Sequence, residues 1–252
     1  MVGVLEGEDA AILEAPFSEE KVFGALSDLN GDKAPGSDGF SMAFWQFSWS
    51  FLKEEVMGFL KDFRDRGRFV KSINASFLVL IPKKGGTEDL KDFRPISLVG
   101  SLYKLLAKVL ANRLKKVMGK IVSKSQNAFV EGRQILDASL IANEVIDLMQ
   151  KSGGGDILCK LDIEKAYDHI QWCIGIVNFS VLINGTSSGF FQSSRGLRQG
   201  VPLSPYLFVI VMEALSCLLK RAKEGGFLPR WQLSGRGRAG VEITHLLFAD
   251  DT

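Results

Sequence analysis

The sequence has few cysteines and lacks an apolar run long enough to form a membrane span. Its three cysteines, Cys159, Cys173 and Cys217, are widely spaced and form neither a disulfide framework nor a C-x-x-C metal motif. The longest apolar stretch, 206–219, is interrupted by Glu213 and indicates a buried helix. The N-terminus carries acids where a signal peptide requires a basic start. These absences predict a soluble intracellular protein, nuclear or cytoplasmic, that is neither secreted nor bound to a membrane.

An excess of charge of one sign is also missing. The chain has 31 basic and 29 acidic side chains and a formal net charge of +2, so its overall charge does not indicate a polyanionic partner. Its two histidines, His169 and His245, have no partner at metal-ligand or triad spacing, and we expect both to be structural. Any argument for a nucleic-acid partner therefore depends on how the charges are distributed.

One segment is strongly biased, because residues 101–130 contain seven basic residues and no acid. The apolar residues recur at helical spacing, which predicts a helix with one inward face and one cationic face. Taken alone, the pattern favours an ordinary solvated helix. In a nucleic-acid-binding protein the same lysines would neutralise phosphates. The basic residues are Lys104, Lys108, Arg113, Lys115, Lys116, Lys120 and Lys124.

Helices and strands alternate along the chain. Turn residues in GDKAPGSDGF separate two N-terminal helices, and five aromatic residues in the second of them are expected to pack in the core: Phe44, Trp45, Phe47, Trp49 and Phe51. The expected elements are a helix starting at Ser18, a helix over 41–66, a strand over 77–81, a loop over 85–98, the basic helix, a hinge at 151–155, a strand over 157–162, a hairpin over 179–192, a helix over 202–223 and a strand over 241–248.

Two of these predicted strands finish in aspartate, at Asp162 and at the Asp250-Asp251 pair. Carboxylates that meet at one edge of a sheet suit magnesium, which takes oxygen ligands and leaves positions for substrate phosphates and water. Two such ions can activate an attacking hydroxyl and stabilise the pyrophosphate that leaves. Each signal alone is weak, since Asp-Asp after a strand is often a turn and Asp162 could be a helix N-cap.

Several peptide patterns in a fixed order resemble those of reverse transcriptases, closest to the plant LINE-type, non-LTR retrotransposons. They are KAPGSDGF, FLVLIPKK, DFRPISLVGSLYKLLAKVLANRL, SQNAFVEGRQILDA, KLDIEKAYD, SVLINGTSSGFF, SSRGLRQGVPLSP and LLFADD. The resemblance implies an α+β right-hand polymerase fold, with fingers over 1–150 and an antiparallel palm sheet backed by helices over 151–252. It also implies RNA-directed DNA polymerase activity with an RNA template, a DNA primer, deoxynucleoside triphosphates and two Mg²⁺ ions, or Mn²⁺ in their place. The oligomeric state is not indicated.

The resemblance also assigns roles to individual residues. Asp162 and Asp250 would hold the two ions, with Asp251 as a supporting acid. Tyr167 matches the steric gate against the ribose 2′-hydroxyl, a role compatible with a buried palm aromatic. The residues that would contact the nucleotide or the nucleic acid are Lys83 and Arg94 at the triphosphate, Gln199 and Gly200 in the nucleotide pocket, and Lys104, Lys108, Lys115 and Arg133 along the nucleic acid.

The sequence departs from the family pattern in three places. Only residues 173–178 separate Trp172 from Phe179, where the family has a helix, and Val201 stands where these elements typically carry Asp. The sequence stops at Thr252, so we expect a palm without a thumb and a polypeptide without an endonuclease or ribonuclease H region. We therefore expect a truncated, degenerate element. Two alternatives are a non-catalytic nucleic-acid-binding remnant and a pseudogene product that does not fold.

Overall fold

The computed structural model describes residues 7–67, 73–152, 178–192, 200–228, 231–233, 241–243 and 245–247. The chain divides into two compact units. One consists of residues 11–113 and 167–204, and the other of residues 1–10, 114–166 and 205–252. The division falls inside α1 (Gly7–Glu14) and α5 (Ser101–Ile121), and it separates the first residue of α7 (Ser204–Glu224) from the rest of that helix. Each unit is described separately below.

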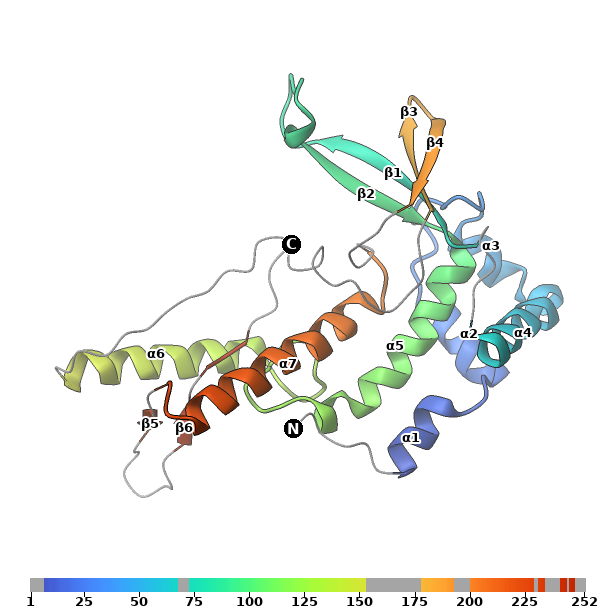
Figure 1. Ribbon diagram of the computed structural model, residues 1–252. Coiled ribbons are helices and arrows are strands. Elements are labelled where there is room, and N and C mark those ends of the chain that lie inside the picture. The colour runs from blue at the N-terminus through green and yellow to red at the C-terminus, as the bar shows by residue number, and fades with distance from the viewer. Residues whose placement is uncertain are drawn as a thin grey trace. The chain divides into compact units, whose positions relative to one another are not determined.

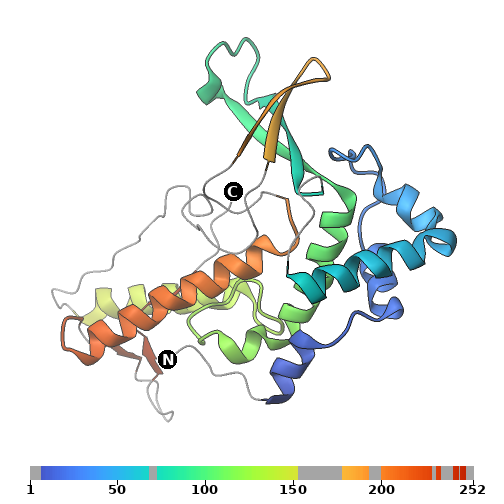
Figure 2. The same ribbon diagram turned by 45° about the vertical axis from the view of Figure 1, so that its right-hand side comes forward.

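The first unit contains a helical cluster. Helices α2 (Glu19–Ser27), α3 (Met42–Phe47) and α4 (Trp49–Arg66) gather beside the first part of α5, as Figures 1 and 2 show. Their apolar faces form a buried core that includes Val22, Leu26, Leu60, Leu105 and Leu106. Ser18 takes the N-cap position of α2 without a side-chain hydrogen bond, whereas the Ser41 side chain accepts one from Phe44 N–H at the start of α3.

The aromatic helix expected over 41–66 is two helices. Ser48, with φ −88° and ψ 5°, interrupts the regular backbone between α3 and α4. Trp49 is buried, but Phe44, Phe47 and Phe51 are 37%, 91% and 66% exposed, so the expected core position of these three phenylalanines is wrong. The buried face of α4 follows Trp49, Val56 and Leu60, and Phe51, two positions after Trp49, falls on another side of the helix.

The first unit also contains a four-stranded sheet in the order β2-β1-β3-β4. The strands are β1 (Ala75–Pro82), β2 (Phe93–Val99), β3 (Asn178–Ile183) and β4 (Thr186–Gln192), and Figure 1 shows them as two hairpins. A 3₁₀ turn, η1 (Leu90–Asp92), precedes β2. The predicted turn of the second hairpin is confirmed, since Asn184 and Gly185 both have positive φ.

The pairing of this sheet is mixed. The β1/β2 and β3/β4 pairs are antiparallel, but β1 and β3 run parallel. The α+β class is confirmed, whereas this sheet is not purely antiparallel. Residues 93–98, expected in a loop, form most of β2. The proline in this segment, Pro95, pairs with Leu80 on an edge strand, where the missing N–H of proline is tolerated.

The second unit contains α6 (Ile135–Ser152), nearly all of α7 (Ser204–Glu224), β5 (Trp231–Leu233) and β6 (Val241–Ile243). The helix predicted over 202–223 is confirmed as α7, and the strand predicted over 241–248 is shorter as β6. Beyond it, Leu247 forms a single parallel bridge with Gln126. In Figure 2 the loop between α5 and α6 passes close to α7. The predicted strand over 157–162 and most of the predicted hinge lie outside the described residues. None of the described helices is long and apolar enough to cross a membrane.

Candidate nucleotide and nucleic-acid site

The end of the β1–β2 hairpin carries both of the predicted triphosphate contacts, Lys83 and Arg94. Arg94 lies opposite Ile81, and the N–H of Lys83 donates to the carbonyl of Asp92 over 2.9 Å, which extends the antiparallel pairing beyond β1. Opposite residues share a face of a sheet and alternate residues along a strand share it too. Lys83, two positions after Ile81, therefore belongs to the same face as Arg94. Both residues are exposed.

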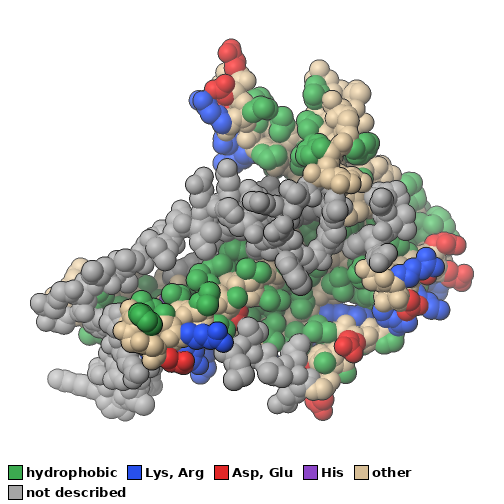
Figure 3. All heavy atoms as spheres, viewed as in Figure 1, with side chains coloured by type: hydrophobic (Ala, Val, Ile, Leu, Met, Phe, Trp, Pro, Cys, Tyr) green, Lys and Arg blue, Asp and Glu red, His purple; other side chains and the backbone are tan. Residues whose placement is uncertain are grey.

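Acids accompany these cations at the hairpin end. The Nζ of Lys91 is 2.7 Å from Asp89, and the Nζ of Lys84 is 4.0 Å from Asp92. The Nζ of Lys83 donates to the carbonyl of Lys91 over 2.7 Å. Figure 3 shows blue and red side chains gathered at this tip. Exposed ion pairs of this kind contribute about 0–1 kcal/mol, so an anion that binds more tightly can displace them.

The GDKAPGSDGF loop is fixed against the start of α5. The Asp38 carboxylate accepts a hydrogen bond from the N–H of Ser101, and the Ser101 hydroxyl donates to the carbonyl of Phe40 over 2.6 Å. The Ser37 hydroxyl donates to the carbonyl of Ala75 over 2.9 Å. At Gly36 a Cβ would lie 2.3 Å from the carbonyl carbon and oxygen of Val99. The backbone of this loop therefore approaches the β2–α5 junction at a distance that only glycine permits.

Lys104 lies near this loop and is half-buried. Burial lowers the pKa of Lys104, the Asp38 carboxylate opposes that shift, and Lys33 adds to it. The predicted nucleic-acid contact at Lys104 is thus close to an acid supplied by a distant part of the sequence.

Three further lysines of α5 also lie close to acids, although residues 101–130 themselves contain none. Lys108 is 3.3 Å from Asp28, within the first unit. Within the second unit, Lys115 is 3.7 Å from Glu131, and Lys120 is 2.8 Å from the buried Asp9. These acids come from α1, from the end of α2 and from the loop after α5. Two of the predicted nucleic-acid contacts, Lys108 and Lys115, are therefore already in ion pairs.

Arg113 has carbonyls and an aromatic ring as partners. Its guanidinium donates to the carbonyls of Leu13 over 2.9 Å and Pro16 over 3.1 Å, and it lies 4.3 Å from the centre of the Phe17 ring. Burial lowers the pKa of Arg113, and the neighbouring Arg64 acts in the same direction. This arrangement fixes the segment before α2 to α5.

Arg133 is hydrogen-bonded to the backbone at the C-terminal end of α5. Its guanidinium donates to the carbonyls of Ser123 over 2.5 Å, Gln126 over 2.7 Å and Val122 over 3.2 Å, with a longer contact to Gly119 at 3.5 Å. Carbonyls at a helix end have no partner within the helix, and a cation there is favourable. Sequence reasoning assigned Arg133 to the nucleic acid and did not identify this structural role, which no local pattern signals.

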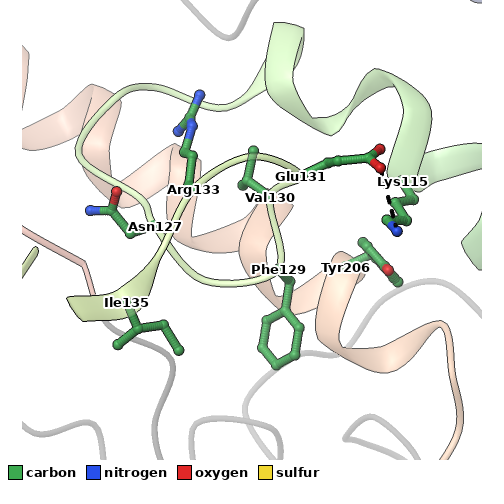
Figure 4. Close-up of a pocket in the computed structure, with 8 residues that line it drawn as sticks. All are labelled: Lys115, Asn127, Phe129, Val130, Glu131, Arg133, Ile135 and Tyr206. Carbon is green, nitrogen blue, oxygen red and sulfur yellow. Dashed lines mark ion pairs between the residues drawn. The ribbon is translucent and has the colours of Figure 1, made fainter. Parts of the chain in front are cut away.

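The loop that carries Arg133 borders a pocket of about 360 Å³, drawn in Figure 4. Phe129 has φ 56°, uncommon for an aromatic residue, and its ring centre is 6.4 Å from that of Tyr206. Figure 4 shows Arg133 pointing away from these two rings. The pocket is lined by Lys115, Asn127, Phe129, Val130, Glu131, Arg133, Ile135 and Tyr206.

Gly200 and Val201 lie just before α7. Gly200 is exposed with φ 77°, a conformation that suits glycine. Val201 is buried, and its carbonyl accepts from the N–H of Ser204 at the start of the helix. The residue that replaces the expected aspartate is therefore a packing residue.

The remaining predicted site residues, Asp162, Tyr167, Gln199, Asp250 and Asp251, lie outside the described residues. Within the part of the chain that the structure describes, no group of three or more His, Cys, Asp or Glu side chains could hold a metal ion. The predicted metal site thus stays a prediction, based on the oxygen chemistry of its aspartates.

The chain is similar in sequence to known proteins, and this similarity identifies its family. Residues 81–252 match the family described as reverse transcriptase (RNA-dependent DNA polymerase), and the chain belongs to this family. Its relatives include Pol polyproteins of R2 retrotransposable elements and the RNA-directed DNA polymerase of mobile element jockey, and the predicted resemblance to non-LTR retrotransposon reverse transcriptases is confirmed.

Three relatives illustrate this similarity. The chain is 30% identical over 235 residues to an uncharacterized 149 kDa protein of transposon TX1 from Xenopus laevis, with 84% of this chain and 18% of that protein covered. It is 27% identical over 241 residues to the Pol polyprotein of an R2 element from Nasonia vitripennis, with 86% of this chain and 22% of that polyprotein covered. It is 51% identical over 80 residues to an uncharacterized mitochondrial protein of Arabidopsis thaliana, with 31% of this chain and 63% of that protein covered. The chain spans less than two thirds of each of these proteins.

Proposed function

We propose that this chain is an RNA-directed DNA polymerase domain that extends a DNA primer on an RNA template by two-metal nucleotidyl transfer. The observation that carries the proposal is the position of Lys83 and Arg94 on one face at one end of the β1–β2 hairpin. The family match supports it, because residues 81–252 include both of these residues and all three aspartates. The guanidinium of Arg94 is suited to two phosphate oxygens at once, and the ammonium of Lys83 adds a point charge.

The metal ions are assigned to the aspartates. Reverse transcriptases use divalent metal ions, and Asp162 and Asp250 would hold two Mg²⁺ ions, with Asp251 as a supporting acid. When bound, these ions activate the primer hydroxyl and stabilise the departing pyrophosphate. Mn²⁺ also takes oxygen ligands and could replace Mg²⁺.

The other predicted residues would select and orient the substrates. Tyr167 would exclude the ribose 2′-hydroxyl of an incoming nucleotide. Gln199 and Gly200 would line the nucleotide pocket, and the positive φ of Gly200 is consistent with a close backbone approach. In this proposal residues 1–150 form the fingers and residues 151–252 the palm.

The nucleic acid would lie along the basic residues of α5. Lys104, Lys108, Lys115 and Arg133 are the proposed contacts. Lys108 and Lys115 already have acidic partners, but a phosphate that binds with release of counterions can compete with weak exposed pairs.

Primer extension on an RNA template tests the proposal. Asp250→Ala should reduce deoxynucleotide incorporation to background, because it removes a carboxylate ligand of the metal site. Asp65→Ala, which removes an exposed acid of α4, is the control and should retain activity. Equal incorporation by the unsubstituted chain and Asp250→Ala would contradict the metal assignment.

A second candidate is a nucleic-acid-binding domain without polymerase activity. The buried Val201, where the resemblance leads us to expect aspartate, is the observation that favours it. Salt-dependent RNA binding by the full chain, together with no extension at any Mg²⁺ or Mn²⁺ concentration, would support this candidate over the polymerase.

A further inference from the structure

The segment that precedes Asp250 and Asp251 is hydrogen-bonded at two positions within the second unit. His245 Nε2 lies 2.8 Å from the Ser216 hydroxyl of α7. The N–H of Leu247 donates to the carbonyl of Ser125 over 2.9 Å, and Leu247 forms a parallel bridge with Gln126. These positions are five and three residues before Asp250. The chain is thus fixed shortly before it reaches the proposed carboxylate pair.

The loop that binds Leu247 is itself anchored to α7 and to Arg133. The Glu213 carboxylate accepts a hydrogen bond from the N–H of Ser123 over 2.9 Å. On the other side of the same loop, the Arg133 guanidinium holds the carbonyls of Ser123 and Gln126. Helix α7 therefore contacts the segment before Asp250 directly through Ser216 and indirectly through Glu213.

Glu213 and Ser216 are an unexpected pair for this part of α7. They are three residues apart, which places them on one side of the helix, and they are only 5% and 3% exposed. The stretch around Glu213 is otherwise apolar, and a buried carboxylate is costly unless it is hydrogen-bonded. Ser216 contacts His245 directly, and Glu213 binds the loop that in turn binds Leu247. Two buried polar groups connected to residues 245–247 indicate a specific structural requirement at that segment.

We infer that Glu213, Ser216 and His245, which we call the α7 clamp, are positioning residues for Asp250 and Asp251. The inference rests on the proposed function, because it assumes that these aspartates bind metal. The hydrogen bonds of the clamp and of Leu247 fix residues 245–247, the segment that directly precedes these carboxylates in the sequence. Partners behind metal ligands typically change metal affinity by 10–100-fold when they are lost, because ligand geometry must be held closely.

The test combines Mn²⁺ binding with amide hydrogen exchange on the full chain. Ser216→Ala and His245→Leu each remove the hydrogen bond to α7, and Glu213→Leu removes the carboxylate that accepts from the N–H of Ser123. We expect Mn²⁺ affinity to fall by roughly 10-fold in each, with faster exchange of the Leu247 amide. His245→Gln, whose side-chain amide can reach Ser216, should restore most of the affinity. A purely structural role would not produce this rescue of metal binding.

Two controls separate the clamp from general loss of stability. Cys217→Ala removes a small side chain next to Ser216 on the same helix and should leave Mn²⁺ affinity unchanged. The amides of Val56 and Leu60, buried in α4 of the other unit, should keep their exchange rates in every variant.

The outcomes distinguish the clamp from the polymerase proposal. The clamp is supported if Mn²⁺ binding depends on Asp250 and weakens in the clamp variants. If the same chain extends no primer, the polymerase proposal fails and the clamp does not. The clamp is overturned if Ser216→Ala leaves Mn²⁺ affinity unchanged, if the Leu247 amide exchanges at its original rate, or if the unsubstituted chain binds no Mn²⁺.

Discussion

At the scale of single residues, Gly36 is the position where the described structure leaves least room for a side chain. A Cβ there would lie 2.3 Å from Val99 backbone atoms and 2.5 Å from the nitrogen of Gly100. Gly36→Ala must therefore separate the GDKAPGSDGF loop from the β2–α5 junction. We expect it to lower the free energy of unfolding in urea by about 2–3 kcal/mol, at the upper end of overpacking costs.

Gly58→Ala provides the control for Gly36→Ala. Gly58 is exposed within α4, and a Cβ there would meet nothing within 4 Å. Alanine has the higher helix propensity, so this variant should gain about 0.5–1 kcal/mol. A gain at Gly36 as well would show that the close approach of the two backbone segments is wrong.

At the scale of elements, the C-terminal end of α5 depends on Arg133. Its guanidinium donates to the carbonyls of Val122, Ser123 and Gln126, which directly follow the last turn of α5, and it makes a longer contact with the carbonyl of Gly119 in that turn. Arg133→Ala should lower the free energy of unfolding in urea by about 2–4 kcal/mol, because hydrogen bonds with a charged donor are lost and buried acceptors are left unpaired. Arg133→Lys should lose most of the same stability, since an ammonium cannot reproduce the planar set of N–H donors with which the guanidinium reaches several carbonyls at once.

The same variants separate this role from nucleic-acid binding. If Arg133 acts through phosphate contact, Arg133→Lys should retain RNA binding while it loses stability, because lysine keeps the charge. Lys124→Ala removes one positive charge from the same loop at an exposed position and is the charge control. Full stability of Arg133→Ala would contradict the helix-end role.

The elements also show what the sequence could predict. Helices α5 and α7 were predicted because their apolar residues repeat at helical spacing over many turns. Strand β2 was missed because charged residues and Pro95 precede its apolar end, and only its edge position makes that composition tolerable. The partners of Arg133 and of the α5 lysines could not be predicted, because backbone carbonyls carry no sequence signal and the acids come from distant segments.

At the scale of the whole molecule, the net charge of +2 is too small to steer RNA, so binding must depend on local cations. Asp28→Asn with Glu131→Gln would release Lys108 and Lys115 from their acidic partners. This double variant raises the net charge from +2 to +4, since each change removes one negative charge. If the two lysines gain phosphate contacts, RNA binding should tighten at low salt. The slope of log K against log salt should become steeper by about 1.4.

Glu54→Gln with Glu55→Gln gives the same net charge of +4 from exposed acids of α4. A general charge effect would change RNA binding equally in both double variants, measured by fluorescence anisotropy over a range of salt concentrations. If the Asp28→Asn, Glu131→Gln variant tightens RNA binding more than the control does, Lys108 and Lys115 contact phosphates themselves. Equal effects would contradict the assignment of Lys108 and Lys115, and the basic residues of α5 would then serve the fold through the acids that already surround them.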